Sequence, residues 1–192
     1  HALALGFDQE YENFFILYRD IFANAIFAPV CGNHDLANVN TYDYSLFTDE
    51  FYLPENGPEG RVTEWNTQKF VKEANYSFNY GGIHFTTLGI GYITFGRGEG
   101  ETETASDFMI EPVKWLENDL SNAIKTGKVR NIIGRAHVVN LYSIRQGNFP
   151  TERLPEDIIY TNILDKYKLA LIFAGHNHSF QRTYPLDHYG DT

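Results

Sequence analysis

Apolar side chains recur at the spacing of one helix face near the start of the chain. The pattern predicts an amphipathic helix over residues 8–25, with its apolar positions at Tyr11, Phe14, Phe15, Tyr18, Ile21 and Phe22. A short apolar run at 26–31 follows and ends at Gly32, which predicts a buried strand in spite of Pro29. The first quarter of the chain thus favours a helix that leads into a strand.

The middle of the chain contains two alternating runs that surround a Gly-Gly pair. The runs cover 76–80 and 83–88, and the pair is Gly81 and Gly82, which together predict a β-hairpin. The stretch from 38 to 72 is rich in Asn, Pro, Gly and aromatic residues without a clear period, and we interpret it as a long excursion.

Helices and apolar strands alternate through the rest of the chain. A flexible loop is expected at 96–106 and a helix at 111–125, which begins with Glu-Pro and carries apolar residues on one face at Val113, Leu116, Leu120 and Ile124. A strand at 129–136, a helix at 154–167 and a strand at 169–174 complete the pattern. This alternation predicts an α/β layered fold, to which the hairpin adds antiparallel character.

Length, charge and cysteine content exclude several classes of protein. The 192 residues suit a single domain with a sizeable core, and no apolar run approaches the length that a bilayer crossing needs, so we expect no membrane contact. A net charge of −10 argues against nucleic-acid binding through a basic face. The single cysteine, Cys31, excludes an intramolecular disulfide and a cysteine-rich zinc site.

Four of the seven histidines come directly after predicted strands. They are His34, His137, His176 and His178, and the carboxyl ends of strands in an open α/β sheet are where ligands gather. Imidazole, amide and carboxylate groups suit divalent first-row metal ions, and a pair of such ions binds phosphate. Each histidine taken alone also fits a structural role, as do His84 and His188, so the prediction rests on the coincidence of the strand ends.

The motifs at these strand ends carry a family resemblance. The sequences GNHD at 32–35 and GHNH at 175–178, with His137 ending a strand between them, resemble the calcineurin-like metallophosphoesterase superfamily. Residues 176–185 and 75–85 are similar to segments of its purple acid phosphatase branch. The resemblance runs from about Phe7 to the C-terminus, and it implies a metallophosphoesterase-like layered β-sandwich flanked by helices.

The resemblance also implies a binuclear metal centre in a complete domain. Asn33, His137 and His176 would bind one metal ion and His178 the other. The ions of this family are divalent or trivalent, and we expect iron, zinc or manganese.

The same resemblance implies roles in hydrolysis for the residues near these ligands. His34 would act as the general acid or stabilise the transition state at the leaving oxygen, and Asp35 would orient its ring. Arg145 is a further candidate that would hold phosphate, although a lone arginine also fits an ordinary surface position. The implied reaction is in-line attack on a phosphate ester by a metal-bound hydroxide.

Two motifs that the family places before GNHD are missing from this sequence. They supply the bridging aspartate and most ligands of the first metal ion, whereas Asp8 and Tyr11 lie in the helical segment and are not expected to replace them. We therefore expect residues 1–192 to be the C-terminal part of a single catalytic domain that lacks its N-terminal strands. We also expect these residues to hold one metal ion or none, to be inactive alone, and to associate through exposed strand edges.

The leading functional hypothesis is a phosphomonoesterase of the acid phosphatase kind that acts on small phosphate esters. A phosphodiesterase or nucleotide hydrolase of the same superfamily shares the two motifs, and a non-catalytic metal-binding domain would retain half of the ligands. The many aromatic residues also admit a carbohydrate-binding surface, although core packing explains them more simply. The resemblance favours an extracytoplasmic location.

Overall fold

A computed structural model of the chain describes both sides of the expected site. The described residues are 8–37, 43–58, 60–61, 69–70, 72–89, 105–137, 162–176, 180, 182 and 184–185. None of the helices in these parts of the chain combines the length and the apolar character that a membrane crossing requires.

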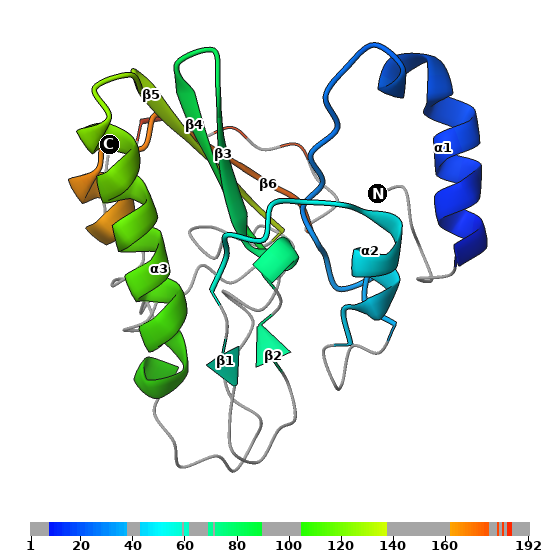
Figure 1. Ribbon diagram of the computed structural model, residues 1–192, viewed down its shortest axis with the longest axis horizontal. Coiled ribbons are helices and arrows are strands. Elements are labelled where there is room, and N and C mark those ends of the chain that lie inside the picture. Colours follow the sequence, from blue (N-terminus) through cyan, green and yellow to red (C-terminus); the bar gives the residue numbers. More distant parts are fainter. Residues whose placement is uncertain are drawn as a thin grey trace.

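The elements follow one another in a mixed α/β order (Figure 1). The helices are α1 (Asp8–Phe22), α2 (Ser45–Glu50) and α3 (Ala105–Lys125), with a 3-10 turn η1 (Lys72–Ala74). The strands are β1 (Gly60–Arg61), β2 (Lys69–Phe70), β3 (Tyr76–Tyr80), β4 (Ile83–Leu88), β5 (Asn131–Ala136) and β6 (Leu171–Ala174). Residues 162–166 form a further short helix.

A four-stranded mixed sheet with the order β3-β4-β5-β6 forms the centre of the described structure. β3 and β4 are the predicted antiparallel hairpin, and its turn uses positive φ angles at both Gly81 and Gly82. β4, β5 and β6 run parallel, with Leu88 opposite Ala136 and Ala136 opposite Ala174. The carboxyl ends of these three strands therefore meet at one edge of the sheet.

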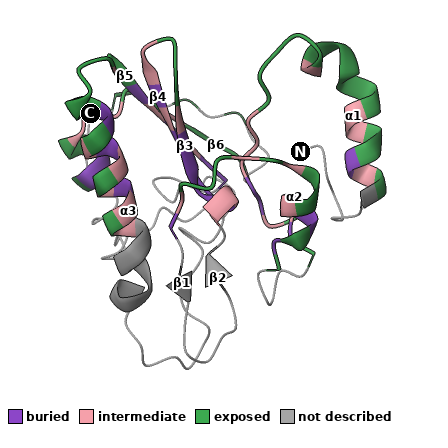
Figure 2. Ribbon diagram, in the orientation of Figure 1, coloured by how far each residue is buried: buried purple, intermediate pink, exposed green. Residues whose placement is uncertain are grey.

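The main apolar core lies between this sheet, α3 and the helix at 162–166 (Figures 1 and 2). Leu116 and Leu120 of α3 are fully buried and pack with Leu88 and Ile132 of the sheet. Val113 is partly buried against this core, as predicted, whereas Ile124 is 46% exposed. The α/β class is confirmed: the structure has a mixed sheet flanked by helices.

Two predicted boundaries in this part of the chain were wrong or only partly right. α3 begins at Ala105, six residues before the predicted start, so residues 105 and 106 are helical rather than part of the loop, and Pro112 lies inside the helix instead of at its start. Ser106 and Asp107, which belong to residue types favoured at helix N-termini, precede Pro112 in the sequence and explain the earlier beginning. The excursion at 38–72 contains α2 and the small β1–β2 pair.

The segment 26–31 does not form the predicted strand. It has no regular secondary structure, because no described strand pairs with it and Pro29 has no backbone N–H to contribute. Side chains of the sheet hold it instead: the Arg135 guanidinium donates to the carbonyl of Ala28, and the Tyr76 hydroxyl donates to the carbonyl of Pro29 at 2.6 Å. The segment is thus attached to the sheet through side-chain hydrogen bonds.

β6 forms one edge of the sheet in the described structure, where its pairing partner is β5. Its side chains are poorly covered, with Leu171 47% and Phe173 59% exposed. The predicted helix at 154–167 is confirmed for 162–166, and its earlier part lies outside the described residues. Most of the predicted loop at 96–106 also lies outside them.

Candidate functional site

The GNHD motif forms a tight turn that closes on its own carboxylate. The backbone N–H of Gly32 donates to Oδ2 of Asp35 at 2.7 Å, and the N–H of Asp35 donates to the carbonyl of Gly32 at 3.1 Å. Short polar side chains commonly bond nearby backbone groups in this way. The turn places Asn33 and His34 between its two fixed ends.

The ring of His137 packs directly against this turn. A Cβ atom at Gly32 would stand 2.7 Å from both Cε1 and Nδ1 of His137, so a larger residue would displace the ring. His137 follows β5 and is 8% exposed. The close approach of the turn to the sheet therefore requires glycine at this position.

Three predicted ligands converge on one point. Nε2 of His137 lies 2.8 Å from Oδ1 of Asn33 and 3.2 Å from Nδ1 of His176. The two imidazole rings meet nearly edge to face, with centroids 5.0 Å apart. These residues are far apart in the sequence, and the ends of β5 and β6 and the GNHD turn bring them together.

The backbone after β6 adopts an uncommon conformation to achieve this. The N–H of Gly175 donates to the carbonyl of His137 at 3.0 Å, which joins the two strand ends beyond the sheet. His176 has φ of 66°, in the left-handed region that costs most residues about 1–2 kcal/mol. Such strain is typical of positions where a side chain must point in a particular direction.

The separation of the three donor atoms fits a bound metal ion. Two ligand atoms held 2.0–2.2 Å from one ion are about 2.8–3.6 Å apart, depending on the coordination geometry. The distances of 2.8 and 3.2 Å fall in this range, and amide oxygen and imidazole nitrogen are suitable ligands. Asn33, His137 and His176 are therefore the described residues that could hold a metal ion.

Additional ligands of the usual acidic or sulfur type are not found in the described residues. Within those ranges no group of three or more His, Cys, Asp and Glu side chains is arranged to hold a metal ion. Asn33 is not one of these four residue types. His178, the predicted ligand of a second ion, and Arg145, the predicted phosphate-binding residue, lie outside the described residues. The predicted ligand sets of both ions therefore stay predictions.

Tyr11, which was not expected to replace the missing metal ligands, contacts this site in another way. Its hydroxyl donates to Oδ1 of Asp35 at 2.9 Å, across 24 positions of the chain. Burial raises the pKa of Tyr11, and the adjacent Asp35 carboxylate raises it further. The helical period explained Tyr11 as a core residue, and no local sequence signal indicates the contact of its hydroxyl. The side chain of Asp8 lies outside the described residues.

The Asp35 carboxylate is largely buried in this arrangement. Burial raises its pKa above the usual range, while the hydrogen bonds from Gly32 and Tyr11 and the nearby His34 act in the opposite direction. Both oxygens accept a described hydrogen bond, from Gly32 and from Tyr11. The predicted role of Asp35 in orienting the His34 ring stays a prediction.

An aromatic cavity of about 390 Å³ opens beside these residues. His34, Asp35, His137 and His176 lie along one part of its wall. Aromatic rings form much of the rest of the cavity wall, namely those of Tyr11, Phe14, Phe27, Phe47, Phe51 and Phe173. His34 is exposed here, so a ligand bound near His137 can reach its ring.

His84 is the histidine for which the structure confirms a purely structural setting. It is 3% exposed on β4, and its ring nitrogens lie 2.8 Å from Oδ1 of Asn79 and 2.9 Å from Oδ2 of Asp119. The same carboxylate accepts a hydrogen bond from the hydroxyl of Ser77. This network joins α3 to the hairpin and is separate from the cavity.

Comparison with known proteins agrees with the motifs that form the site. The family model of the calcineurin-like phosphoesterases matches residues 6–180, which include every residue of the converging cluster. Metal-dependent hydrolysis of phosphate esters is the general chemistry of this family, which generally uses divalent metal ions.

Two relatives from Mycobacterium tuberculosis also match this chain. They are the uncharacterized protein MT2654 of strain CDC 1551 / Oshkosh and the uncharacterized protein Rv2577 of strain ATCC 25618 / H37Rv. Each is 21% identical over 160 residues, which are 82% of this chain and 28% of the relative, so the chain spans less than a third of their length. No solved structure matches the chain. The family match over 6–180 establishes that this chain belongs to the calcineurin-like phosphoesterase family.

Proposed function

We propose that the protein is a metal-dependent phosphomonoesterase related to the purple acid phosphatases. The observation that carries the proposal is the meeting of Asn33 Oδ1, His137 Nε2 and His176 Nδ1 at 2.8 and 3.2 Å. Family membership supports the reaction type, and the similarity of residues 75–85 and 176–185 to the phosphatase branch supports the monoester as substrate.

The proposed metal centre uses Asn33, His137 and His176 for one ion and His178 for a second. Iron, zinc or manganese would supply positive charge that attracts the phosphate group and would make water more nucleophilic at neutral pH. The positive charge matters here because the chain has a formal net charge of −10 and must still bind an anion.

In this proposal His34 is the proton donor. It is exposed on the same cavity wall as His137 and His176, and it belongs to the turn that Asp35 closes. A protonated imidazole at this place donates its proton to the leaving alkoxide oxygen as the ester bond breaks. Arg145 is proposed to bind a phosphate oxygen.

The edge of β6, which pairs only with β5 among the described strands, leads to a second part of the proposal. A further β-strand pairs there, covers Leu171 and Phe173, and brings the carboxylate ligands that the described residues lack. Residues 1–192 would then be the C-terminal part of the catalytic domain and inactive by themselves. The comparison of activity between this chain and the full-length protein tests this part.

The test of the main proposal is hydrolysis of 4-nitrophenyl phosphate by the full-length protein loaded with iron, zinc or manganese. His137→Ala is expected to lower kcat/KM at least 100-fold and to weaken zinc binding, because it removes the central ligand of the cluster. His84→Asn is the matched control, since it removes a buried imidazole outside the cavity. It should lower stability and leave kcat/KM near the wild-type value.

Several outcomes would contradict the proposal. Unchanged zinc affinity in His137→Ala would exclude the proposed metal site. Full activity in His34→Ala would exclude the proposed proton transfer by that histidine. Faster hydrolysis of bis(4-nitrophenyl) phosphate than of the monoester would indicate a phosphodiesterase. Zinc binding without hydrolysis of either ester would indicate a non-catalytic metal-binding domain.

A further inference from the structure

The GNHD turn depends on a residue far outside its own motif. Both oxygens of Asp35 are engaged, one by the backbone of Gly32 in the same turn and one by the hydroxyl of Tyr11 in α1. The first bond closes the turn, and the second fixes the carboxylate that closes it. The position of Asn33 and His34 is therefore linked to α1 through this carboxylate.

The Tyr11 side chain is well suited to hold this carboxylate in place. It is 2% exposed, its ring packs edge to face on Phe51 at 5.3 Å, and it shares a small buried cluster with Leu46 of α2. A ring fixed by packing delivers its hydroxyl to one point, so the hydrogen bond costs little further loss of side-chain freedom.

Beyond Tyr11, described side chains of α1 contact other segments through the rings of Phe14, Phe15 and Phe22. Ile16, Leu17 and Ile21 are 69%, 73% and 58% exposed, and most of the helix is exposed in Figure 2. Tyr11 is the buried aromatic residue of this helix among its described side chains. The hydroxyl of Tyr11 therefore connects α1 to the GNHD turn.

We propose that Tyr11 is a positioning residue of this site, which acts through Asp35 to hold the turn that presents Asn33 and His34. Without its hydroxyl, Oδ1 of Asp35 lacks its buried donor, and the carboxylate can rotate away from the Gly32 N–H. The turn then opens more often, and Asn33 spends less time beside His137. The consequence for the metal site rests on the proposed function, whereas the consequence for the turn does not.

The decisive experiment is amide hydrogen exchange in the metal-free full-length protein with Tyr11→Phe. Exchange of the Gly32 and Asp35 amides is expected to rise about tenfold, because both amides donate within the turn and a partly buried hydrogen bond to the Asp35 carboxylate has been removed. Tyr76→Phe is the matched control: it removes a buried hydroxyl that holds Pro29 of the same segment at 2.6 Å but does not touch Asp35. It loosens the segment without acting through the carboxylate, so exchange at Gly32 should rise clearly less than in Tyr11→Phe.

A double-mutant cycle separates positioning from general destabilisation. In an Asp35→Ala background, Tyr11→Phe should cause no further increase in exchange at Gly32, because the acceptor of its hydroxyl is gone. Equal exchange at Gly32 in Tyr11→Phe and Tyr76→Phe would overturn the proposal. The same increase in both backgrounds would also overturn it, since the effect would not pass through Asp35.

Zinc titration of the same variants connects the turn to the metal site. Tyr11→Phe is expected to weaken zinc binding about tenfold, as is usual when the support of a ligand is lost, and Tyr76→Phe should leave it within about twofold. If the wild-type protein binds no zinc and hydrolyses no ester, the proposed function fails. Amide exchange at Gly32 then still decides whether Tyr11 holds the turn.

Discussion

Two regions of this molecule are held together by different means. The sheet region, formed by β3–β6 with α3 and the helix at 162–166, combines continuous strand pairing with a buried aliphatic core. The N-terminal region, residues 8–37 and 43–58, shares no strand pairing with that sheet in the described structure. It is attached through side-chain hydrogen bonds, from Arg135 to Ala28, from Tyr76 to Pro29 and between Asn56 and Ser77. The close approach of Gly32 to the His137 ring adds a further contact.

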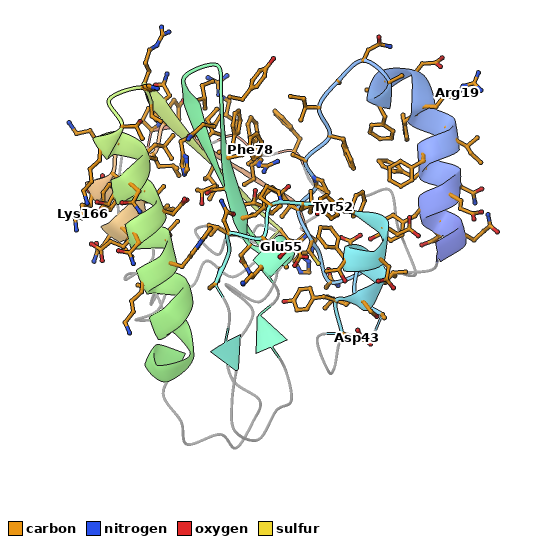
Figure 3. All side chains as sticks on the ribbon, viewed as in Figure 1. Arg19, Asp43, Tyr52, Glu55, Phe78 and Lys166 are labelled. Atoms are coloured by element: carbon orange, nitrogen blue, oxygen red, sulfur yellow. The ribbon has the colours of Figure 1, made fainter. Side chains whose placement is uncertain are left out.

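Figure 3 shows the contrast at labelled side chains. Phe78 lies on β3, where the Arg135 guanidinium is 5.2 Å from its ring centroid, whereas Arg19 on α1 points away from the rest of the molecule. The candidate site lies between the regions: Asn33 and His34 belong to the N-terminal region, and His137 and His176 follow strands of the sheet. The geometry of the site therefore depends on the less firmly attached region, and the following predictions test this difference.

The largest effect is expected in the core of the sheet region. Leu120→Ala leaves a cavity beneath the sheet and should lower the free energy of unfolding by about 3 kcal/mol, because Leu120 is fully buried among aliphatic neighbours. Urea denaturation followed by circular dichroism measures this change. A loss below about 1 kcal/mol would show that this core is less closely packed than the burial indicates.

The second effect concerns the contact between the two regions. Gly32→Ala places a methyl group against the His137 ring and should cost about 2 kcal/mol of stability, together with most of the zinc affinity. Gly127→Ala provides the control, because a Cβ there meets no atom within 4 Å and only the positive φ is strained. Normal zinc binding in Gly32→Ala would mean that the turn and the ring separate without loss.

A third effect, on the attachment of the N-terminal region, is expected from Arg135→Lys. Lysine cannot donate to Ala28 and Thr87 together in the planar geometry of the guanidinium, so about 1.5 kcal/mol of local stability should be lost. Cys31 reports the opening: it is fully buried, and burial raises the pKa of its thiol well above the usual range.

Labelling of Cys31 with a thiol reagent should therefore become about tenfold faster in Arg135→Lys, because the thiol reacts only when the region opens. Amide exchange in β4 and β5 should change much less. If strand amides and Cys31 respond equally, the two regions open as one unit and the distinction between them is wrong.

The smallest effect is expected on the outer face of α1. Leu17 is 73% exposed, so Leu17→Gln should change the free energy of unfolding by less than about 0.5 kcal/mol. The measurement is the same urea titration that is used for Leu120→Ala. A loss above about 1 kcal/mol would show that this face is covered in solution, for example by another copy or another part of the protein.

The sequence indicated the sheet and the converging side chains because both depend on local patterns. Apolar runs at 83–88, 129–136 and 169–174 correspond to β4, β5 and β6, and residues that follow parallel strands necessarily meet at one edge. The meeting of His137 and His176 was therefore predictable, and the GNHD motif pointed to Asn33 as the third member.

The wrong strand at 26–31 and the contact of Tyr11 that the sequence did not indicate concern features that local patterns do not determine. The run at 26–31 is as apolar as a strand, but a strand also needs a partner for its backbone, which the described residues do not offer. The Tyr11–Asp35 hydrogen bond joins a helix to a turn 24 residues away, and only tertiary packing brings them together. A helical period explains why Tyr11 is buried without indicating what its hydroxyl contacts.

The left-handed backbone of His176 has an evolutionary consequence. Glycine would adopt the same φ without the steric penalty, so selection for thermodynamic stability alone would favour glycine over histidine at this position. The imidazole is retained at an energetic disadvantage in the place where it meets His137. Directed evolution for heat resistance without selection for catalysis should therefore replace His176 early, and on the proposed function the stabilised descendants should bind metal more weakly.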